Sequence, residues 1–393
     1  MTTPKRRSRA FIIARVMQIL MMLGVTAVAQ LSMRAHVFAA ERDVYVSPEG
    51  AGSRNGHAPT DAMTLQQGLQ LARTGSNAIR LLLTAGKYDV SALGSAHLQT
   101  QADSPLTIEG AGLTTVLVGG YRPGASPDSS LFVLWRGNVT FRNFMVRNVA
   151  RLIAVPNGGT PEGVVVSDIA IRDVYDGIVI DRGKELLARD WRIENLDISG
   201  YVRVGIRLAG PRTQRIAIHG AVIDGGGVRA DNNCYKAGIQ LYEAVSDVTI
   251  EDVSIANNIA CAGPPYQQGD GIEADDKQGA PQRIALRRVV STGNRDGAFD
   301  LKAKDMTLED LFADSAGVSR SGFRFWGYPY ICIRCRVAGD KSDFQLNNAK
   351  LLLRDPPQAD ALAHIRCNDR KELPSSVYQV EIAGNSSGEL VCR

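Results

Sequence analysis

A short glycine-centred phrase recurs through most of this chain, with its glycines roughly 25 to 33 residues apart. In each copy an apolar residue follows the glycine within two positions, and a second apolar phrase comes about ten residues later. Repetition at this period is typical of solenoids, in which each repeat packs only on its neighbours. The copies are Asp176-Gly177-Ile178, Val204-Gly205-Ile206, Ala237-Gly238-Ile239, Asp270-Gly271-Ile272, Asp296-Gly297-Ala298-Phe299 and Ser321-Gly322-Phe323.

Within these phrases apolar and polar residues alternate, so each phrase predicts a short strand with one buried and one polar face. This alternation excludes helical repeats. A sandwich or barrel stays open, but neither would need the phrase to recur in register. We therefore predict an all-β, right-handed parallel β-helix over residues 41–393, with coils about 4.8 Å apart. The prediction stacks five glycines in successive coils, namely Gly205, Gly238, Gly271, Gly297 and Gly322.

Residues 1–40 contain six basic residues and no acidic ones; five of the six precede the apolar run 16–31, and Arg34 follows it. This pattern predicts an export signal or an uncleaved membrane anchor, and either places the body in a secreted or periplasmic setting. Without these residues the chain has 39 basic and 41 acidic side chains, so nucleic acid is not an expected partner. Any membrane contact is expected only through this segment.

The segment Thr64–Arg73 has helical apolar spacing and precedes two further strand-like phrases. A solenoid must hide its first coil from water, so we expect a short N-terminal capping helix here. The rest of the body is expected to form a single domain and a monomer.

Six cysteines in an exported chain favour disulfides. Cys234 and Cys261 precede equivalent strands of consecutive coils, so we expect them to pair, and Cys367 with Cys392 could close the C-terminal end. Cys332 and Cys335 have the C-x-x-C spacing of a redox pair or of two metal ligands. With His364 and Cys367 they could form a four-residue metal site.

Outward-facing positions of successive coils stack into ladders, because side chains alternate between the faces of a strand. We expect these ladder residues to face solvent. The first ladder reads Val179, Arg207, Gln240, Glu273, Asp300 and Arg324, and the second reads Asp181, Ala209, Tyr242, Asp275, Lys302 and Trp326, with Asn347 in the next coil.

Four carboxylates therefore converge on adjacent coils: Asp270 and Asp296 at the entrances of strands, and Glu273 and Asp300 in the first ladder. Such carboxylates repel one another unless a cation or a shared proton offsets their charge. Calcium is the natural candidate because it takes oxygen ligands in irregular geometry. Ordinary surface charge on a solenoid is the alternative.

The opening run from Val44 to Gly50 and the order of the later phrases resemble the family-nine pectate lyases, which are calcium-dependent. In that family an Asp-Gly-Phe strand precedes an Asn-x-Asp-Asp-Gly-Phe-Asp cluster, and Gly-Phe-Lys follows. The corresponding phrases here begin at Asp270, run from Asn294 to Asp300, and end in Arg324. The chain departs from the family at Gly297, where a second aspartate is expected, and at Arg324, where lysine is expected.

The resemblance implies calcium-assisted β-elimination on a uronate-containing polysaccharide. Arg324 and Lys302 are the candidate catalytic residues, and Trp326, Tyr242 and Asn347 are candidates for contact with the sugar. Reprotonation of the same enolate would make a uronate C5-epimerase. A polygalacturonase-like hydrolase using Asp270, Asp296 and Asp300, and a non-catalytic exopolysaccharide-binding or export scaffold, also stay open.

Overall fold

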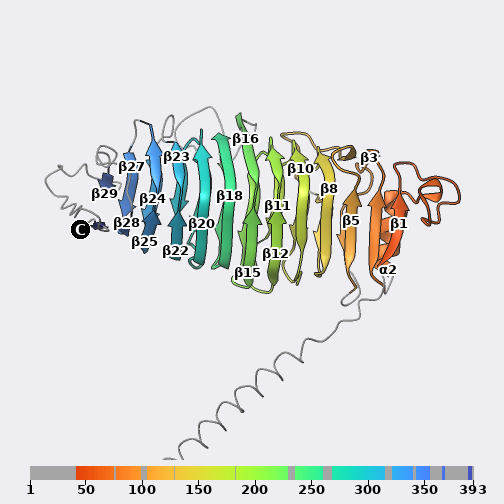
Figure 1. Ribbon diagram of the computed structural model, residues 1–393, viewed down its shortest axis with the longest axis horizontal. Helices are drawn as coiled ribbons and strands as arrows, with labels where there is room; N and C mark the ends of the chain where they lie inside the picture. Colours follow the sequence, from red (N-terminus) through yellow and green to blue (C-terminus); the bar gives the residue numbers. More distant parts are fainter. Residues whose placement is uncertain are drawn as a thin grey trace, which may run out of the picture. The chain divides into compact units, whose positions relative to one another are not determined.

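The computed structural model describes residues 41–393, with gaps at 75–76, 99–103, 128, 182, 229–234, 260–267, 315–320, 340–341, 355–364, 368–387 and 392–393. Strands make up nearly all of the regular structure, and in the described residues they form two large sheets. Almost every strand pairs in parallel with the equivalent strand one coil further along the body (Figure 1). This arrangement is the parallel β-helix that the repeat predicts.

The smaller sheet takes one strand from each coil. Each of its eleven described strands pairs in parallel with the next. In spatial order they are β4 (Ala96–Leu98), β7 (Phe132–Leu134), β9 (Arg151–Val155), β11 (Asp176–Ile180), β14 (Val204–Ala209), β17 (Tyr235–Tyr242), β19 (Gln268–Asp275), β21 (Gly297–Leu301), β24 (Ser321–Trp326), β27 (Ser342–Asn347) and β29 (Ile365–Cys367).

In most coils the larger sheet takes two strand segments, joined at a bend with positive φ. Asn195 and Asp310 hold such bends, at φ of 52° and 53°, which asparagine and aspartate tolerate better than most residues. The nineteen described strands are β1 (Arg42–Val46), β2 (Ile79–Leu83), β3 (Gly86–Asp89), β5 (Leu106–Gly110), β6 (Thr115–Val118), β8 (Val139–Arg147), β10 (Val165–Arg172), β12 (Ala188–Glu194), β13 (Asp197–Ser199), β15 (Thr213–His219), β16 (Val222–Val228), β18 (Ser246–Ile259), β20 (Gln282–Thr292), β22 (Lys304–Glu309), β23 (Phe312–Asp314), β25 (Pro329–Ile333), β26 (Arg336–Ala338), β28 (Lys350–Arg354) and β30 (Gly388–Val391). The last pair, β28 with β30, is antiparallel.

The core lies between the two sheets and continues from coil to coil. Phe299, Phe323 and Phe344 stack in three successive coils, with ring centroids 4.7 Å and 5.3 Å apart. All three side chains are buried. Because each coil repeats the same inward positions, like side chains meet like side chains along the axis.

The predicted glycine column is correct except at Gly297. Gly205, Gly238 and Gly271 stand one residue after paired positions of β14, β17 and β19. In the next coil Gly297 pairs with Asp270, so Ala298 takes the place beside Gly271. The cause is the extra residue before Phe299, which must point into the core at the position that Ile272 holds one coil earlier.

The helix α2 (Leu65–Thr74) covers the first coil, as expected for a cap. Thr64 and Gln67 form a capping box at its start: Gln67 N donates to Thr64 Oγ1 at 3.3 Å, and Thr64 N donates to Gln67 Oε1 at 3.0 Å. The short 3₁₀ helix η1 (Pro59–Asp61) precedes it. Among the described residues, no helix has the length and apolar character of a membrane span.

Cys332 and Cys335 form a disulfide across the turn that follows β25, with their Cα atoms 5.7 Å apart. Two cysteines joined in this way are not available as thiolate ligands, so the pairing disfavours the metal site and agrees with the redox spacing. His364 and the predicted pairs Cys234–Cys261 and Cys367–Cys392 involve positions outside the described residues, as does the predicted export segment.

Candidate functional site

The outer face of the smaller sheet carries the predicted first ladder in register. Gln240 pairs with Glu273, Glu273 with Asp300, and Asp300 with Arg324. The ladder continues to Gln345 in β27. In the second ladder Ala209 pairs with Tyr242, Tyr242 with Asp275, and Trp326 with Asn347. The side chains proposed from sequence therefore lie on one face, over neighbouring coils.

Three carboxylates converge on one nitrogen of Arg324. Its Nη2 lies 3.0 Å from Asp270 Oδ1, 3.0 Å from Asp296 Oδ2 and 2.7 Å from Asp300 Oδ2. The four residues, called here the Arg324 cluster, come from β19, the turn before β21, β21 and β24. The fold thus brings together three of the four predicted metal ligands and one predicted catalytic residue.

The Arg324 cluster is buried, which corrects the expectation of a solvent-facing ladder. Arg324 is 1% exposed, Asp270 and Asp296 are 0% exposed, and Asp300 is 4% exposed. Outward side chains of one coil pack against those of the next, so an outward position in a strand does not guarantee contact with water.

Lys302 and Trp326 form the accessible rim of the cluster. Trp326 Nε1 donates a hydrogen bond to Asp300 Oδ1 at 2.6 Å, and Lys302 Nζ lies 3.3 Å from Asp300 Oδ2. The Lys302 ammonium also lies 5.3 Å from the centre of the Trp326 ring. The Lys302 side chain is 22% exposed, so it can meet a ligand that the cluster itself cannot reach.

The electrostatics of the site follow from one guanidinium among several buried carboxylates. Burial raises the pKa of Asp270 well above its ordinary value; Arg324 acts against this, while Asp296 and Asp300 add to it. Burial lowers the pKa of Lys302, but Asp300 and other neighbouring carboxylates outweigh it, so the net shift is upward.

Gly297 leaves room for the Arg324 guanidinium. A Cβ at this position would lie 3.3 Å from Arg324 Nε and 3.3 Å from Asp270 Oδ1. A larger side chain would therefore press between the cation and one of its carboxylates. Gly297 is the position at which the resembled family has a second aspartate. Here the Arg324 side chain lies against the point where the side chain of that aspartate would begin.

Glu273 stands apart from the other predicted metal ligands. It accepts hydrogen bonds from Gln240 Nε2 at 2.8 Å, from Gln268 Nε2 at 2.7 Å, from Tyr242 at 3.3 Å and from Tyr235. The pKa of Glu273 is raised, and burial is the largest of the several effects that act on it. Four donors from two coils hold this carboxylate in a network beside the Arg324 cluster.

Sequence reasoning missed Tyr235 and Gln268, which begin β17 and β19 and pair with each other. Both residues come before the glycine-centred phrase, and the ladders were predicted only from positions after the glycine. Tyr242, a predicted sugar contact, is 8% exposed and is part of the same network. Asn347, another predicted contact, is 5% exposed and accepts a hydrogen bond from Gln345 Nε2 at 3.2 Å. Trp326 is the most accessible of the three predicted sugar contacts, and it lies beside Lys302, a predicted catalytic residue.

The chemistry of the donor set suits calcium, which prefers carboxylate oxygens. Asp270 Oδ2 is buried and has no hydrogen-bond partner among the described residues, so one oxygen is available as a ligand. However, Arg324 Nη2 stands where Asp270, Asp296 and Asp300 converge. A bound calcium ion would have to take its place.

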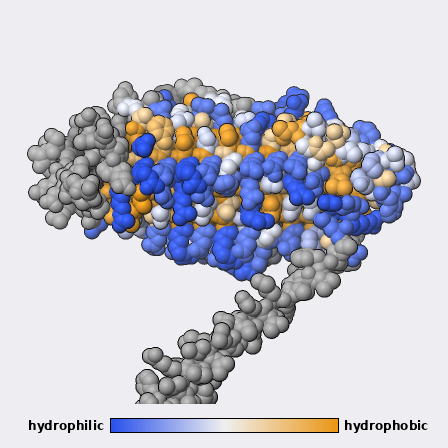
Figure 2. Space-filling view, in the orientation of Figure 1, coloured by the Kyte–Doolittle hydropathy of each residue, from blue (hydrophilic) through white to orange (hydrophobic). Residues whose placement is uncertain are grey.

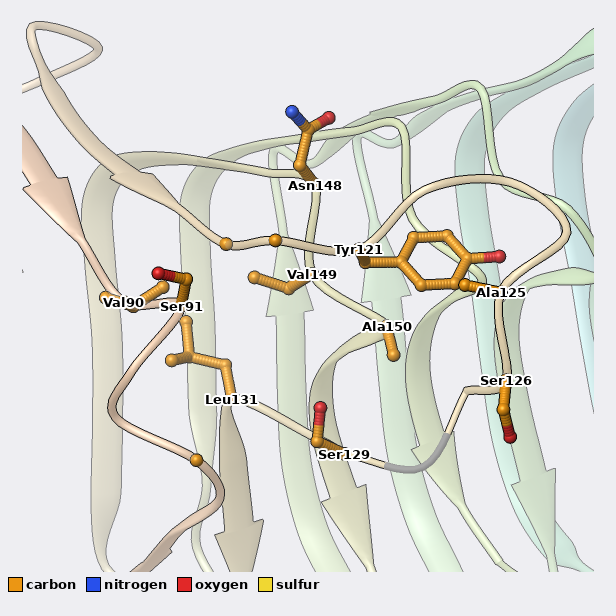
Figure 3. A pocket seen from close by; sticks show the side chains of 13 residues that line it. Val90, Ser91, Tyr121, Ala125, Ser126, Ser129, Leu131, Asn148, Val149 and Ala150 are labelled. Atoms are coloured by element: carbon orange, nitrogen blue, oxygen red, sulfur yellow. The ribbon is translucent and has the colours of Figure 1, made fainter.

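A cavity of about 320 Å³ lies elsewhere, at the turns that lead into β4, β7 and β9 (Figure 3). Its walls include Ser91, Tyr121, Ser126 and Asn148, and no member of the Arg324 cluster lines it. This cavity therefore lies several coils away from the cluster.

The larger sheet carries exposed ion pairs between neighbouring coils. Arg215 Nε lies 2.7 Å from Asp190 Oδ1, and Arg334 Nε lies 2.6 Å from Asp310 Oδ1. Hydrophilic residues run along the body in bands on the face shown in Figure 2. Solvent-exposed pairs of this kind contribute little to stability.

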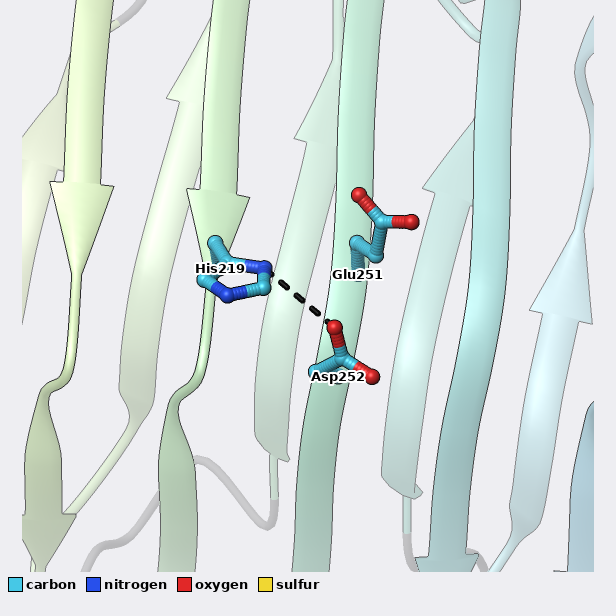
Figure 4. A group of neighbouring side chains, drawn as sticks. All are labelled: His219, Glu251 and Asp252. Atoms are coloured by element: carbon cyan, nitrogen blue, oxygen red, sulfur yellow. Dashed lines mark ion pairs between the residues drawn. The ribbon is translucent and has the colours of Figure 1, made fainter.

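His219, Glu251 and Asp252 lie close enough to one another, within 4.8 Å, to hold a metal ion (Figure 4). His219 Nδ1 is 3.4 Å from Asp252 Oδ2, but Arg288 already pairs with both carboxylates, at 2.6 Å to Asp252 Oδ1. The group is exposed or half-buried, and its carboxylates have a protein cation. We assign it to the exposed ion pairs of the larger sheet.

No family model matches the sequence, and no curated protein matches it. Among solved structures the chain is similar to a pectate lyase, Pel9A, with a TM-score of 0.48, 14% identity, and coverage of 78% of this chain and 79% of that one. It is also similar to a rhamnogalacturonan lyase, with a TM-score of 0.49, 12% identity, and coverage of 83% and 85%. A third likeness is to the catalytic domain of a GH87 α-1,3-glucanase, with a TM-score of 0.39, 15% identity, and coverage of 78% and 66%.

Likenesses this distant carry no argument about activity. The parallel β-helix rests on the strand pairing of the chain itself. Membership of the family-nine pectate lyases stays a prediction from the sequence.

Proposed function

We propose that the protein binds an acidic polysaccharide across the rim of the Arg324 cluster and cleaves it by β-elimination at a uronate. The observation that carries this proposal is the convergence of three buried carboxylates on Arg324, beside an accessible Lys302 and Trp326. Buried charge of this density is costly to maintain, so it favours a functional role over a structural one. Export to a secreted or periplasmic location, expected from residues 1–40, belongs to the same proposal.

The reaction needs a base for the C5 proton and positive charge for the carboxylate beside it. Removal of the proton leaves an enolate; its electrons form the C4–C5 double bond as the C4–O4 bond breaks, and water protonates the departing oxygen. The three carboxylates around Arg324 stabilise its protonated form, so we assign Arg324 as a fixed cation. Lys302 reaches the rim, and we assign it as the base.

Trp326 offers an aromatic face for the sugar ring, with its indole nitrogen anchored on Asp300. Calcium on Asp270, Asp296 and Asp300 stays a prediction from the sequence, because the ion would have to displace the Arg324 guanidinium that holds these carboxylates.

The geometry disfavours the hydrolase that the sequence left open. Asp270, Asp296 and Asp300 are buried and share Arg324 Nη2, whereas an inverting pair needs two carboxyls roughly 6.5 to 9.5 Å apart with room for a water between them. An epimerase shares the first proton transfer with a lyase, so the products must separate the two.

The test is to incubate the body with a panel of uronate polymers, with and without a chelator, and to follow the absorbance of unsaturated chain ends. A lyase produces that absorbance from at least one polymer, and calcium assistance makes the rate sensitive to the chelator. Exchange of solvent hydrogen at C5 without cleavage would indicate the epimerase. Binding without either change would leave the binding scaffold.

A further inference from the structure

Asp176, at the start of β11, is a buried carboxylate held by two arginines. Arg203 Nη2 lies 2.8 Å from Asp176 Oδ2 and Arg203 Nε lies 3.1 Å from Asp176 Oδ1, while Arg151 Nε lies 3.0 Å from Asp176 Oδ2. Asp176 is 0% exposed, whereas the two arginine side chains are 22% and 21% exposed. Two positive charges therefore meet one negative charge, and their outer edges reach solvent.

Aromatic rings line the same place. The Tyr175 ring lies under both guanidinium groups, with its centre 5.1 Å from Arg203 Cζ and 5.8 Å from Arg151 Cζ. The Tyr121 ring meets Tyr175 edge to face, with centroids 6.3 Å apart. The four residues Asp176, Arg151, Arg203 and Tyr175 are called here the Asp176 group.

The Asp176 group adjoins the cavity of Figure 3. Tyr121 lines that cavity, and so does Ala150, whose carbonyl oxygen accepts a hydrogen bond from Asp176 N at 3.0 Å. Pro127, beside the lining residue Ser126, accepts a hydrogen bond from Arg151 Nη1 at 2.8 Å. Among the described residues, the cavity thus has serine hydroxyls and a tyrosine ring on its walls and an excess of positive charge at its edge.

The group shares a column with the Arg324 cluster. Asp176 pairs with Val204, Val204 with Ala237, and Ala237 with Asp270, so three coil steps separate the two sites. At the spacing of neighbouring strands this is roughly 14 Å along the axis. Both sites lie at the entrances of strands in the smaller sheet, on a line that an extended chain could follow.

We propose that the Asp176 group and the adjoining cavity bind an acidic sugar, with the sugar carboxylate on the outer edges of Arg151 and Arg203 and the sugar ring in the cavity. Guanidinium groups recognise carboxylates through paired N–H donors, and their attachment to Asp176 fixes them in place before the ligand arrives. Tyrosine faces suit the apolar side of a sugar ring, and hydroxyl side chains suit its polar edge. This binding does not depend on any reaction at the Arg324 cluster.

The experiment measures binding of a galacturonate oligomer by titration calorimetry. All proteins carry Lys302→Gln, so that the oligomer is not consumed by the proposed reaction. Adding Arg203→Gln should weaken binding at least tenfold, because one guanidinium and the excess charge are lost. Adding Arg215→Gln, at an exposed arginine of the larger sheet, should leave the affinity unchanged and controls for a general loss of positive charge.

A second variant, Tyr121→Ala, changes the cavity without touching Asp176, and should weaken binding several-fold even where Arg203→Gln does not fold. The anion is identified with a sulfated oligomer of the same length and with a neutral one. Binding of the galacturonate oligomer alone supports the proposal. Equal binding of the sulfated or the neutral oligomer, or unchanged affinity in both Arg203→Gln and Tyr121→Ala, overturns it.

Discussion

The Arg324 cluster and the Asp176 group share one column of strand entrances in the smaller sheet and have opposite compositions. In the first, one cation meets three carboxylates, and Arg324 is 1% exposed. In the second, one carboxylate meets two cations, whose side chains are about one fifth exposed. An excess of buried negative charge has to be balanced inside the protein, whereas an excess of positive charge at a partly open edge can exchange water for an anion.

The largest effect is expected for Arg324→Ala. Removing the guanidinium takes away the cation that all three buried carboxylates share, while Lys302 stays beside Asp300, so we expect the free energy of unfolding to fall by about 3 to 5 kcal/mol. A solvent-facing ladder, which the sequence predicts, would have made the loss small; the burial of Arg324 makes it large. Urea denaturation of the variant and the parent protein measures the difference.

Arg334→Ala is the matched control, because Arg334 makes ion pairs with two carboxylates on the exposed face. It should change stability very little. Calcium added to Arg324→Ala should restore part of the lost stability by taking the place of the guanidinium. A loss in Arg324→Ala no larger than that in Arg334→Ala would contradict the inference that the cluster needs its internal cation.

A smaller loss is expected for Asp176→Asn. The two arginines lose their shared charge partner, but both reach solvent, so the cost should be about 1 to 3 kcal/mol. Thermal or urea unfolding measures it, with Asp190→Asn on the exposed face as control. If Asp176→Asn costs as much as Arg324→Ala, the two regions do not differ in the way that their exposure indicates.

The smallest expected effect is on how the free energy of unfolding depends on pH. The pKa of Asp270 is raised above its ordinary value of 3.8, so the folded state holds a proton that the unfolded state releases. Its contribution to stability is therefore present at low pH and is lost as the pH rises through the raised value. Asp270→Asn should flatten the fall in unfolding free energy that sets in as the pH rises above about 4.

Asp252→Asn gives the opposite control. Hydrogen bonds from Arg288 lower the pKa of Asp252, so its contribution is present above the ordinary value and is lost as the pH falls. A slope in Asp270→Asn equal to that of the parent protein would show that Asp270 is ionised over the whole range.

Much of the fold could be predicted because every coil has to bury the same alternate residues of its strands. The alternation around Ile206, Ile239 and Ile272 sets which face is buried, and a single slip would expose the whole strand. The misplacement of Gly297 in the glycine column has the same origin. The glycine fits the repeat in sequence, but the burial of Phe299 sets the register of the strand.

Only the part of the site that follows from the stacking of equivalent strand positions could be predicted. Register alone placed Glu273, Asp300 and Arg324 in one ladder. It could not show that the Arg324 side chain turns across two coils to Asp270, or that Tyr235 and Gln268 hold Glu273. Those contacts depend on rotamers and on turn geometry, which a repeat pattern does not contain.

The central claim is tested most directly by the initial rate of unsaturated-end formation in Lys302→Gln, on the uronate polymer that the parent protein cleaves. We expect a loss of at least tenfold, since removing a general base typically costs about 10²- to 10⁴-fold. We also expect the parent rate to rise into the alkaline range, because neighbouring carboxylates raise the pKa of Lys302. Lys304→Gln is the matched control, because Lys304 lies over the Tyr328 ring as Lys302 lies over Trp326, with 5.7 Å from ammonium to ring centre. It should keep the parent rate. Equal rates in Lys302→Gln and Lys304→Gln, or no unsaturated ends from any uronate polymer, would contradict the account.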